Sequence, residues 1–201
     1  ILKSESPLGP FRLHSDKTVT PKDWECLDGT LYEAPSGEYY MVFCHEWVQT
    51  KIGRMCYAEL KEDFSGLASE PVVMFAAADA MPGAGRVTDG PFFFRSDKGG
   101  ALHMIWSNVV KGKGYCVLNR TSSSGRLTGP WTEDKVLFGR DGGHGMIFKT
   151  FDGKLKLTLH QPNKTPHERM KLFDIEDDGE TLRLSRSSMP ASPGRRETVL
   201  T

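Results

Sequence analysis

The chain has 201 residues with 26 basic and 26 acidic side chains, so its formal net charge is zero. This length is enough for one sizeable hydrophobic core. A neutral chain lacks the basic surface that binds nucleic acid or anionic membranes, so we expect neither as a partner. No apolar run approaches the length of a membrane span.

The sequence pattern is that of an all-β protein. Short runs rich in aromatic and β-branched residues are broken by Gly, Pro, Asp and Ser, and no long stretch has a clean helical period. The four cysteines are scattered, without a CxxC pair or the spacing of a zinc site. Cys44 and Cys116 lie in apolar strand patterns, where a buried free thiol is the expected state.

Three segments read as copies of one unit, and each opens on a polar residue followed by glycine. They begin at Asp28, Asp89 and His144, so the openings are 61 and 55 positions apart. Each opening leads into an apolar strand, a glycine-containing turn and a second strand, expected at 39–47, 101–108 and 155–163. A repeat near this length is typical of a β-propeller blade, whose first strand lines the central channel.

Each unit offers two further strands. Third strands are expected at 54–60, 115–119 and 170–175, and fourth strands at 63–67, 127–131 and 181–184. The segment 6–11 matches 127–131 and predicts the last strand of a preceding blade.

These units predict a partial propeller over residues 1–185, with about three complete four-stranded blades and openings near 28, 89 and 144. Three blades do not close a ring of the usual four to eight, so we expect the missing N-terminal blades to belong to a longer chain. Residues 186–201 have the composition of a C-terminal loop or linker.

The three openings predict one site, because equivalent positions of a propeller converge on its axis. Asp-Gly is also a common turn dipeptide, so Asp28 and Asp89 have a purely local interpretation as well. Their recurrence at one blade position favours a functional role for the pair. His144 is open to two interpretations, a structural histidine or a channel residue, and its flanking glycines allow close backbone approach.

The ends of the second strands are expected on the same face as the openings. They carry side chains that suit carbohydrate, since aromatic rings stack on sugars while carboxylates and amides bind hydroxyls. The candidate substrate-binding residues are His45, Glu46, Trp47, Trp106 and His160. Either tryptophan also fits a place in the blade core, and Glu46 also fits an ion pair at the rim.

Taken together, these segments resemble glycoside hydrolase family 43, a family of five-bladed β-propeller glycosidases. The resemblance covers roughly residues 1–185. It is carried by the segments 24–32, 87–92 and 142–148 and by the Gly-Pro-aromatic stretches.

The resemblance implies inverting hydrolysis with three carboxylates. Asp28 matches the aspartate that adjusts the pKa of the acid, and Asp89 matches the general acid, where the family usually has glutamate. His144 matches a channel histidine that helps to hold calcium through its water shell, and no organic cofactor is implied. The matching general base would lie on a blade outside this chain. The shorter Asp89 moves the proton donor by about one methylene, which leaves three alternatives: a narrower site, proton donation by Glu46, or weak activity.

The implied substrates are arabinofuranosides, xylosides or galactosides of plant polysaccharide, and an extracellular or periplasmic location follows from them. Two other functions stay open at this point. One is a non-catalytic carbohydrate-binding propeller, and the other is an incomplete, inactive fragment that depends on its missing blades.

Overall fold

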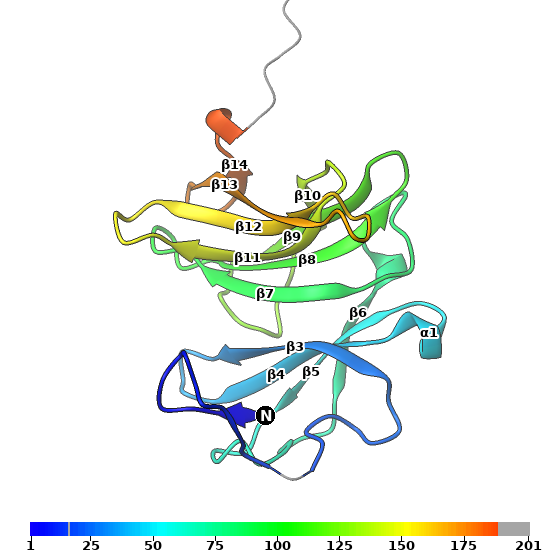
Figure 1. The fold of residues 1–201 in the computed structure, drawn as a ribbon, viewed down its shortest axis with the longest axis vertical. Coiled ribbons are helices and arrows are strands. Elements are labelled where there is room, and N and C mark those ends of the chain that lie inside the picture. The colour runs from blue at the N-terminus through cyan, green and yellow to red at the C-terminus, as the bar shows by residue number, and fades with distance from the viewer. Residues whose placement is uncertain (16, 189–201) are drawn as a thin grey trace, which may run out of the picture.

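The described residues, 1–15 and 17–188 of the computed structural model, are built almost entirely from antiparallel strands. They form three four-stranded sheets and one two-stranded sheet (Figure 1), which confirms the all-β, blade-like architecture. The short helices are α1 (Trp47–Thr50), η1 (Ala77–Asp79) and η2 (Arg186–Ser188). Within the described residues, no helix has the length and apolar character needed to cross a membrane.

The three large sheets follow one another along the chain, and neighbouring strands are consecutive in sequence. The first sheet contains β3 (Cys26–Glu33), β4 (Tyr39–His45), β5 (Arg54–Glu59) and β6 (Val72–Ala76). The second contains β7 (Asp89–Arg95), β8 (Leu102–Val110), β9 (Gly114–Ser122) and β10 (Lys135–Phe138). The third contains β11 (Gly143–Lys149), β12 (Leu155–Gln161), β13 (Arg169–Asp177) and β14 (Leu182–Leu184).

The second sheet is buried on both faces. Met104 and Trp106 of β8 pack against the first sheet, while Ile105 between them packs against the third. Successive side chains of a strand point to opposite faces, so a strand buried on both sides becomes a nearly continuous apolar run. The innermost strands also meet, with β7 lying between β3 and β11 (Figure 1).

The expected fourth strands of the first two sheets are wrong in position. Residues 63–67 form a turn in which Ser65 N donates to Asp63 Oδ1 (2.9 Å) and Phe64 has a φ of +57°. The strand comes later, as β6, in a run rich in β-branched and aromatic residues. Likewise, residues 127–131 form a loop closed by a hydrogen bond from Trp131 Nε1 to Leu127 O (2.9 Å), and β10 follows it.

The N-terminal segment repeats this second pattern. Residues 6–11 are a loop rather than the predicted strand, and they contain a cis Gly9–Pro10 bond like the cis Gly129–Pro130 bond before β10. The strands on either side, β1 (Leu2–Lys3) and β2 (Arg12–Leu13), pair with each other in antiparallel fashion. This order of strand, Gly-Pro loop and strand is the one found from β9 to β10.

The third sheet has one face that no described element covers. Met146, Phe148, Met170 and Leu172 of this face are 49%, 36%, 74% and 53% exposed. They alternate with buried residues such as Ile147, which faces the second sheet. We call these four side chains the open face.

The start of the expected C-terminal loop packs on the third sheet. Residues 186–188 form η2, and the backbone N–H of Asp174 donates to Ser188 Oγ (2.7 Å). Residues 189–201 lie outside the described part of the chain. Cys44 and Cys116 are buried free thiols, as predicted.

Candidate active site

The first strand of each large sheet carries a register shift at its opening, and the three shifts occur at one equivalent place. They fall between Leu27 and Thr30, between Asp89 and Phe92, and between Gly143 and Met146. β-Bulges of this kind often lie beside active sites, where they change the direction of a side chain.

This register corrects the repeat alignment by one residue in the second unit. The residues with a left-handed backbone are Asp28 (φ +57°), Gly90 (φ +50°) and His144 (φ +55°). Gly90, rather than Asp89, is therefore equivalent to Asp28 and His144. Asp89 occupies the position of Leu27 and Gly143, one step earlier along the strand.

Gly90 allows Asp28 and His144 to approach each other. Its backbone N–H donates to Asp28 Oδ2 (2.9 Å), and a Cβ atom at this position would lie 3.0 Å from the His144 ring. His144 Nε2 lies 3.7 Å from Asp28 Oδ1. Two features favour glycine at this position: the positive φ, and the His144 imidazole that occupies the space of a side chain.

Asp89 lies beside this pair and has its own partner. Its Oδ2 accepts a hydrogen bond from the Tyr115 hydroxyl (2.7 Å). Burial is the main cause that raises the pKa of Asp89 above its ordinary value, and the negative charges of Asp28 and Glu46 add to it. The hydrogen bond from Tyr115 and the charge of His144 act in the opposite direction. A carboxyl group with a raised pKa near a second carboxylate is the arrangement that general acids use.

His144 is about half exposed, and its backbone N–H is fixed by Ser107 Oγ (2.8 Å). The described residues contain no group of three or more His, Cys, Asp or Glu side chains arranged to hold a metal ion. Calcium prefers six to eight oxygen ligands, and here one imidazole and one carboxylate are at hand. The described residues therefore do not form a direct calcium cage, and calcium at His144 stays a prediction.

The residues at the end of β4 have different surroundings. His45 is buried, its ring stacks on Trp24 (centroids 4.0 Å apart), and its Nε2 lies 2.6 Å from Gln49 Oε1. Glu46 follows it and holds a buried Oε1 that has no hydrogen-bond partner among the described residues. Trp47 begins α1, is partly exposed and lies under Arg86, whose guanidinium carbon is 5.4 Å from the ring centroid.

Among these residues, Glu46 is the one whose negative charge acts on Asp89. His45 is held by packing and by Gln49, which suits a supporting role better than contact with a ligand. Trp47 lies at the start of α1, partly exposed and packed with Arg86.

Trp106 does not fit its predicted place in a cleft. Its side chain is fully buried between the first and second sheets. Its indole Nε1 donates to Asp134 Oδ1 (2.7 Å), and Asp134 also binds Arg120 Nε (3.0 Å). Trp106 is a core residue, because it stands on the strand of the middle sheet that is covered on both faces.

His160 does lie near the openings, and it leads to a residue that the sequence pattern missed. It stands opposite Gly143 in the register of the third sheet, and its ring stacks on Tyr115 (centroids 5.6 Å apart). Tyr115 is buried and contacts Asp89 directly. The glycine pair before His144 is the sequence signal for it, because a Cβ atom on Gly143 would lie 2.3 Å from the Tyr115 ring.

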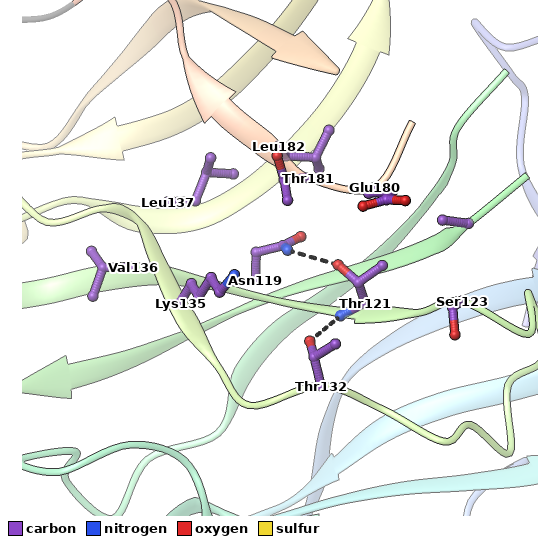
Figure 2. Close-up of a pocket in the computed structure, with 11 residues that line it drawn as sticks. Asn119, Thr121, Ser123, Thr132, Lys135, Val136, Leu137, Glu180, Thr181 and Leu182 are labelled. Atoms are coloured by element: carbon purple, nitrogen blue, oxygen red, sulfur yellow. Dashed lines mark hydrogen bonds between the residues drawn. The ribbon is translucent and has the colours of Figure 1, made fainter. Parts of the chain in front are cut away.

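A cavity of about 370 Å³ lies elsewhere, between the outer strands of the second and third sheets. Figure 2 shows Asn119, Thr121 and Thr132 on one side of it, with Glu180 and Thr181 on the other. None of the eight predicted site residues lines this cavity. The candidate active site is therefore the surface around the three openings.

The fold and the site together define a partial β-propeller whose openings bring two carboxylates together, one of them with a pKa raised mainly by burial. Residues 1–182 match the model of the glycosyl hydrolases family 43, so the chain belongs to that family. This confirms the resemblance noted in the sequence. No curated protein matches the chain.

Solved structures agree with this assignment. The chain is similar to an endo-arabinase from Bacteroides thetaiotaomicron VPI-5482, with 36% identity, a TM-score of 0.81, and coverage of 90% of this chain and 66% of that one. A thermostable family-43 glycoside hydrolase shares the fold at 17% identity, with a TM-score of 0.76 and coverage of 97% and 68%. An endo-1,4-beta-xylanase from Bacteroides thetaiotaomicron VPI-5482 does so at 21% identity, with a TM-score of 0.69 and coverage of 90% and 65%. The chain thus spans about two thirds of the length of these proteins.

Proposed function

We propose that this chain carries the general acid of an inverting glycoside hydrolase that acts on plant polysaccharide, and that the general base lies outside this chain. The observation that carries the proposal is the meeting of Asp28, Asp89 and His144 at three equivalent bulges, with the pKa of Asp89 raised by burial and by Asp28. Asp89 protonates the leaving oxygen of the glycosidic bond. A water, activated by a carboxylate that this chain does not supply, attacks the anomeric carbon from the opposite side.

Asp28 assists Asp89 without touching the substrate. Its negative charge disfavours ionisation of Asp89, so more of the acid is protonated at a given pH. The bond from Gly90 N fixes one oxygen of Asp28 and keeps that charge in place. Glu46, Trp47 and His160 are proposed to contact the sugar around this pair, with His45 supporting Glu46.

The substrate class follows from family membership and from the relatives. One similar structure, at 36% identity, is an endo-arabinase, and another is an endo-1,4-beta-xylanase. Arabinose-containing polysaccharide is therefore our first choice, with xylosides and galactosides as the alternatives. Such polymers lie outside the cytoplasm, so we propose an extracellular or periplasmic location.

The test uses two lengths of protein, the 201-residue chain and a form extended to the length of the relatives. Both are assayed on nitrophenyl arabinofuranoside, xyloside and galactoside and on arabinan, each beside Asp89→Asn. Activity of the extended form that Asp89→Asn abolishes supports the proposal. Full activity in Asp89→Asn would refute Asp89 as the acid. A folded, inactive extended form that binds oligosaccharide by calorimetry would identify a binding propeller instead.

A further inference from the structure

Asp89 carries its carboxyl group on a single methylene, so the orientation of that group decides where its proton lies. The carboxyl group of an aspartate turns about two side-chain bonds, and a shift near 1 Å in a reacting group can reduce a rate about 100-fold. A group that fixes this carboxylate is therefore of direct use to the reaction. Tyr115 is in contact with it.

The Tyr115 ring is held on several sides. Its residue lies in β9, two strands from Asp89 in β7, so the side chain reaches across β8 to the carboxylate. His160 stacks on the ring, and the backbone of Gly143 lies so close that a Cβ atom there would be 2.3 Å from a ring carbon. The residue is 5% exposed, and its backbone carbonyl accepts a hydrogen bond from Gly142 N (2.8 Å).

The two oxygens of Asp89 are unequal as a result. Oδ2 accepts a hydrogen bond from the Tyr115 hydroxyl (2.7 Å). Among residues 1–15 and 17–188, no group donates a hydrogen bond to Oδ1. Burial and the charge of Asp89 raise the pKa of Tyr115, so the phenol keeps its proton and can donate it to the carboxylate. A donor fixed on Oδ2 leaves the carboxyl proton to Oδ1.

We propose that Tyr115 is a positioning residue that holds Oδ2 of Asp89 and thereby presents Oδ1 as the proton donor. The inference rests on the proposed function, in which Asp89 is the general acid. His160 and Gly143 contribute to this role, because their contacts hold the Tyr115 ring and the Tyr115 hydroxyl holds the Asp89 carboxylate. Tyr115 itself touches no reacting atom.

The first test does not need activity. The carboxyl groups of the 201-residue chain are labelled with ¹³C, the Asp89 signal is assigned with Asp89→Asn, and its titration is followed by NMR in wild type and in Tyr115→Phe. The hydrogen bond favours the ionised carboxylate, so its loss moves the titration of Asp89 to higher pH. Tyr32→Phe is the matched control, because Tyr32 is also buried and accepts a hydrogen bond from Arg95 Nη2 (2.9 Å), and Arg95 is at the opposite end of β7 from Asp89.

The second test uses the extended form if it is active. Tyr115→Phe should lower kcat/KM by about 10- to 100-fold and move the alkaline limb of its pH profile to higher pH, while Tyr32→Phe changes neither. Gly143→Ala keeps the hydroxyl but displaces the ring, so it should act in the same direction. Thermal melting of each variant shows whether it is folded, and Gly143→Ala serves if Tyr115→Phe does not fold.

The outcomes separate the two proposals. An Asp89 titration and a pH profile that are unchanged in folded Tyr115→Phe would overturn the positioning role, even if Asp89→Asn is inactive. Full activity in Asp89→Asn would instead overturn the proposed function. A shifted titration in Tyr115→Phe with a lowered rate supports both.

Discussion

The substitution Asp134→Ala tests whether the network around Trp106 is part of the core. Asp134 is 6% exposed and accepts hydrogen bonds from Trp106 Nε1 (2.7 Å) and Arg120 Nε (3.0 Å). Arg120 is 7% exposed, and its guanidinium carbon lies 3.6 Å from the ring centroid of Phe75 in β6. The network therefore links the second sheet to the first.

The expected loss is large because two buried donors lose their acceptor together. Removing one partner of a buried ion pair costs about 3–5 kcal/mol, since the other charge stays buried and unpaired. An unsatisfied buried N–H such as that of Trp106 costs about 1–3 kcal/mol. The two costs overlap at one carboxylate, so we expect Asp134→Ala to lower the free energy of unfolding by about 4–5 kcal/mol. At about 2–4 °C per kcal/mol for a chain of this size, Tm falls by about 8–20 °C.

The assay is urea and thermal unfolding followed by circular dichroism. Asp152→Ala is the control, because Asp152 forms an exposed ion pair with Lys154 (2.8 Å) and surface pairs of this kind contribute little. The double variant Arg120→Met/Asp134→Leu should recover the part of the loss that comes from the unpaired Arg120, since apolar residues often replace a buried ion pair without cost, while Trp106 Nε1 still lacks its acceptor. A loss below about 1 kcal/mol in Asp134→Ala would refute the reasoning. It would mean that water reaches Arg120 and Trp106, and Trp106 would again be a candidate for the cleft.

Three further predictions follow from the site and from the open face. Asp28→Asn removes a charge that raises the pKa of Asp89, so the alkaline limb of kcat/KM should move to lower pH, opposite to Tyr115→Phe; a limb that stays in place contradicts this. Asp89→Asn should stabilise the fold near pH 7 relative to wild type and not near pH 3. The folded-state pKa of Asp89 is raised, so wild type loses stability as the pH rises from the unfolded value of about 3.9 through the folded one. Urea unfolding measures the difference in unfolding free energy between Asp89→Asn and wild type, and an equal difference near pH 7 and near pH 3 would contradict this prediction. Met146→Lys with Leu172→Lys should change the unfolding free energy of this chain by less than about 0.5 kcal/mol per site, because both side chains are already about half exposed. The same two substitutions should destabilise the extended form if further blades pack on the open face. Gel filtration and thermal melting of the 201-residue chain and of the extended form test this.

The sequence predicted the sheets well because their signal is local. Apolar runs broken by Gly, Asp and Pro place the first three strands of every sheet within a few residues of where they lie. The fourth strands failed at residues 63–67 and 127–131 because these segments have aromatic residues and satisfy their hydrogen bonds within tight turns. Both turns contain a backbone with positive φ, which short apolar patterns do not reveal.

The candidate site was predicted in part. Asp28, Asp89 and His144 meet, as the repeat suggested, but the repeat aligned Asp89 one residue out of step with the other two. A motif of two residues does not show where a bulge inserts its extra residue. Trp106 was misplaced because a tryptophan at a strand end has the same sequence pattern in a core and in a cleft.

By itself, the sequence determined the all-β class, the repeat and the residue types at the three openings, because alternation, turn residues and spacing are properties of the chain alone. Only the tertiary structure decided that Gly90 lies between Asp28 and His144, and that Tyr115 reaches Asp89 from two strands away. Those contacts depend on register and on packing between sheets, and a shift of one residue turns a side chain to the other face.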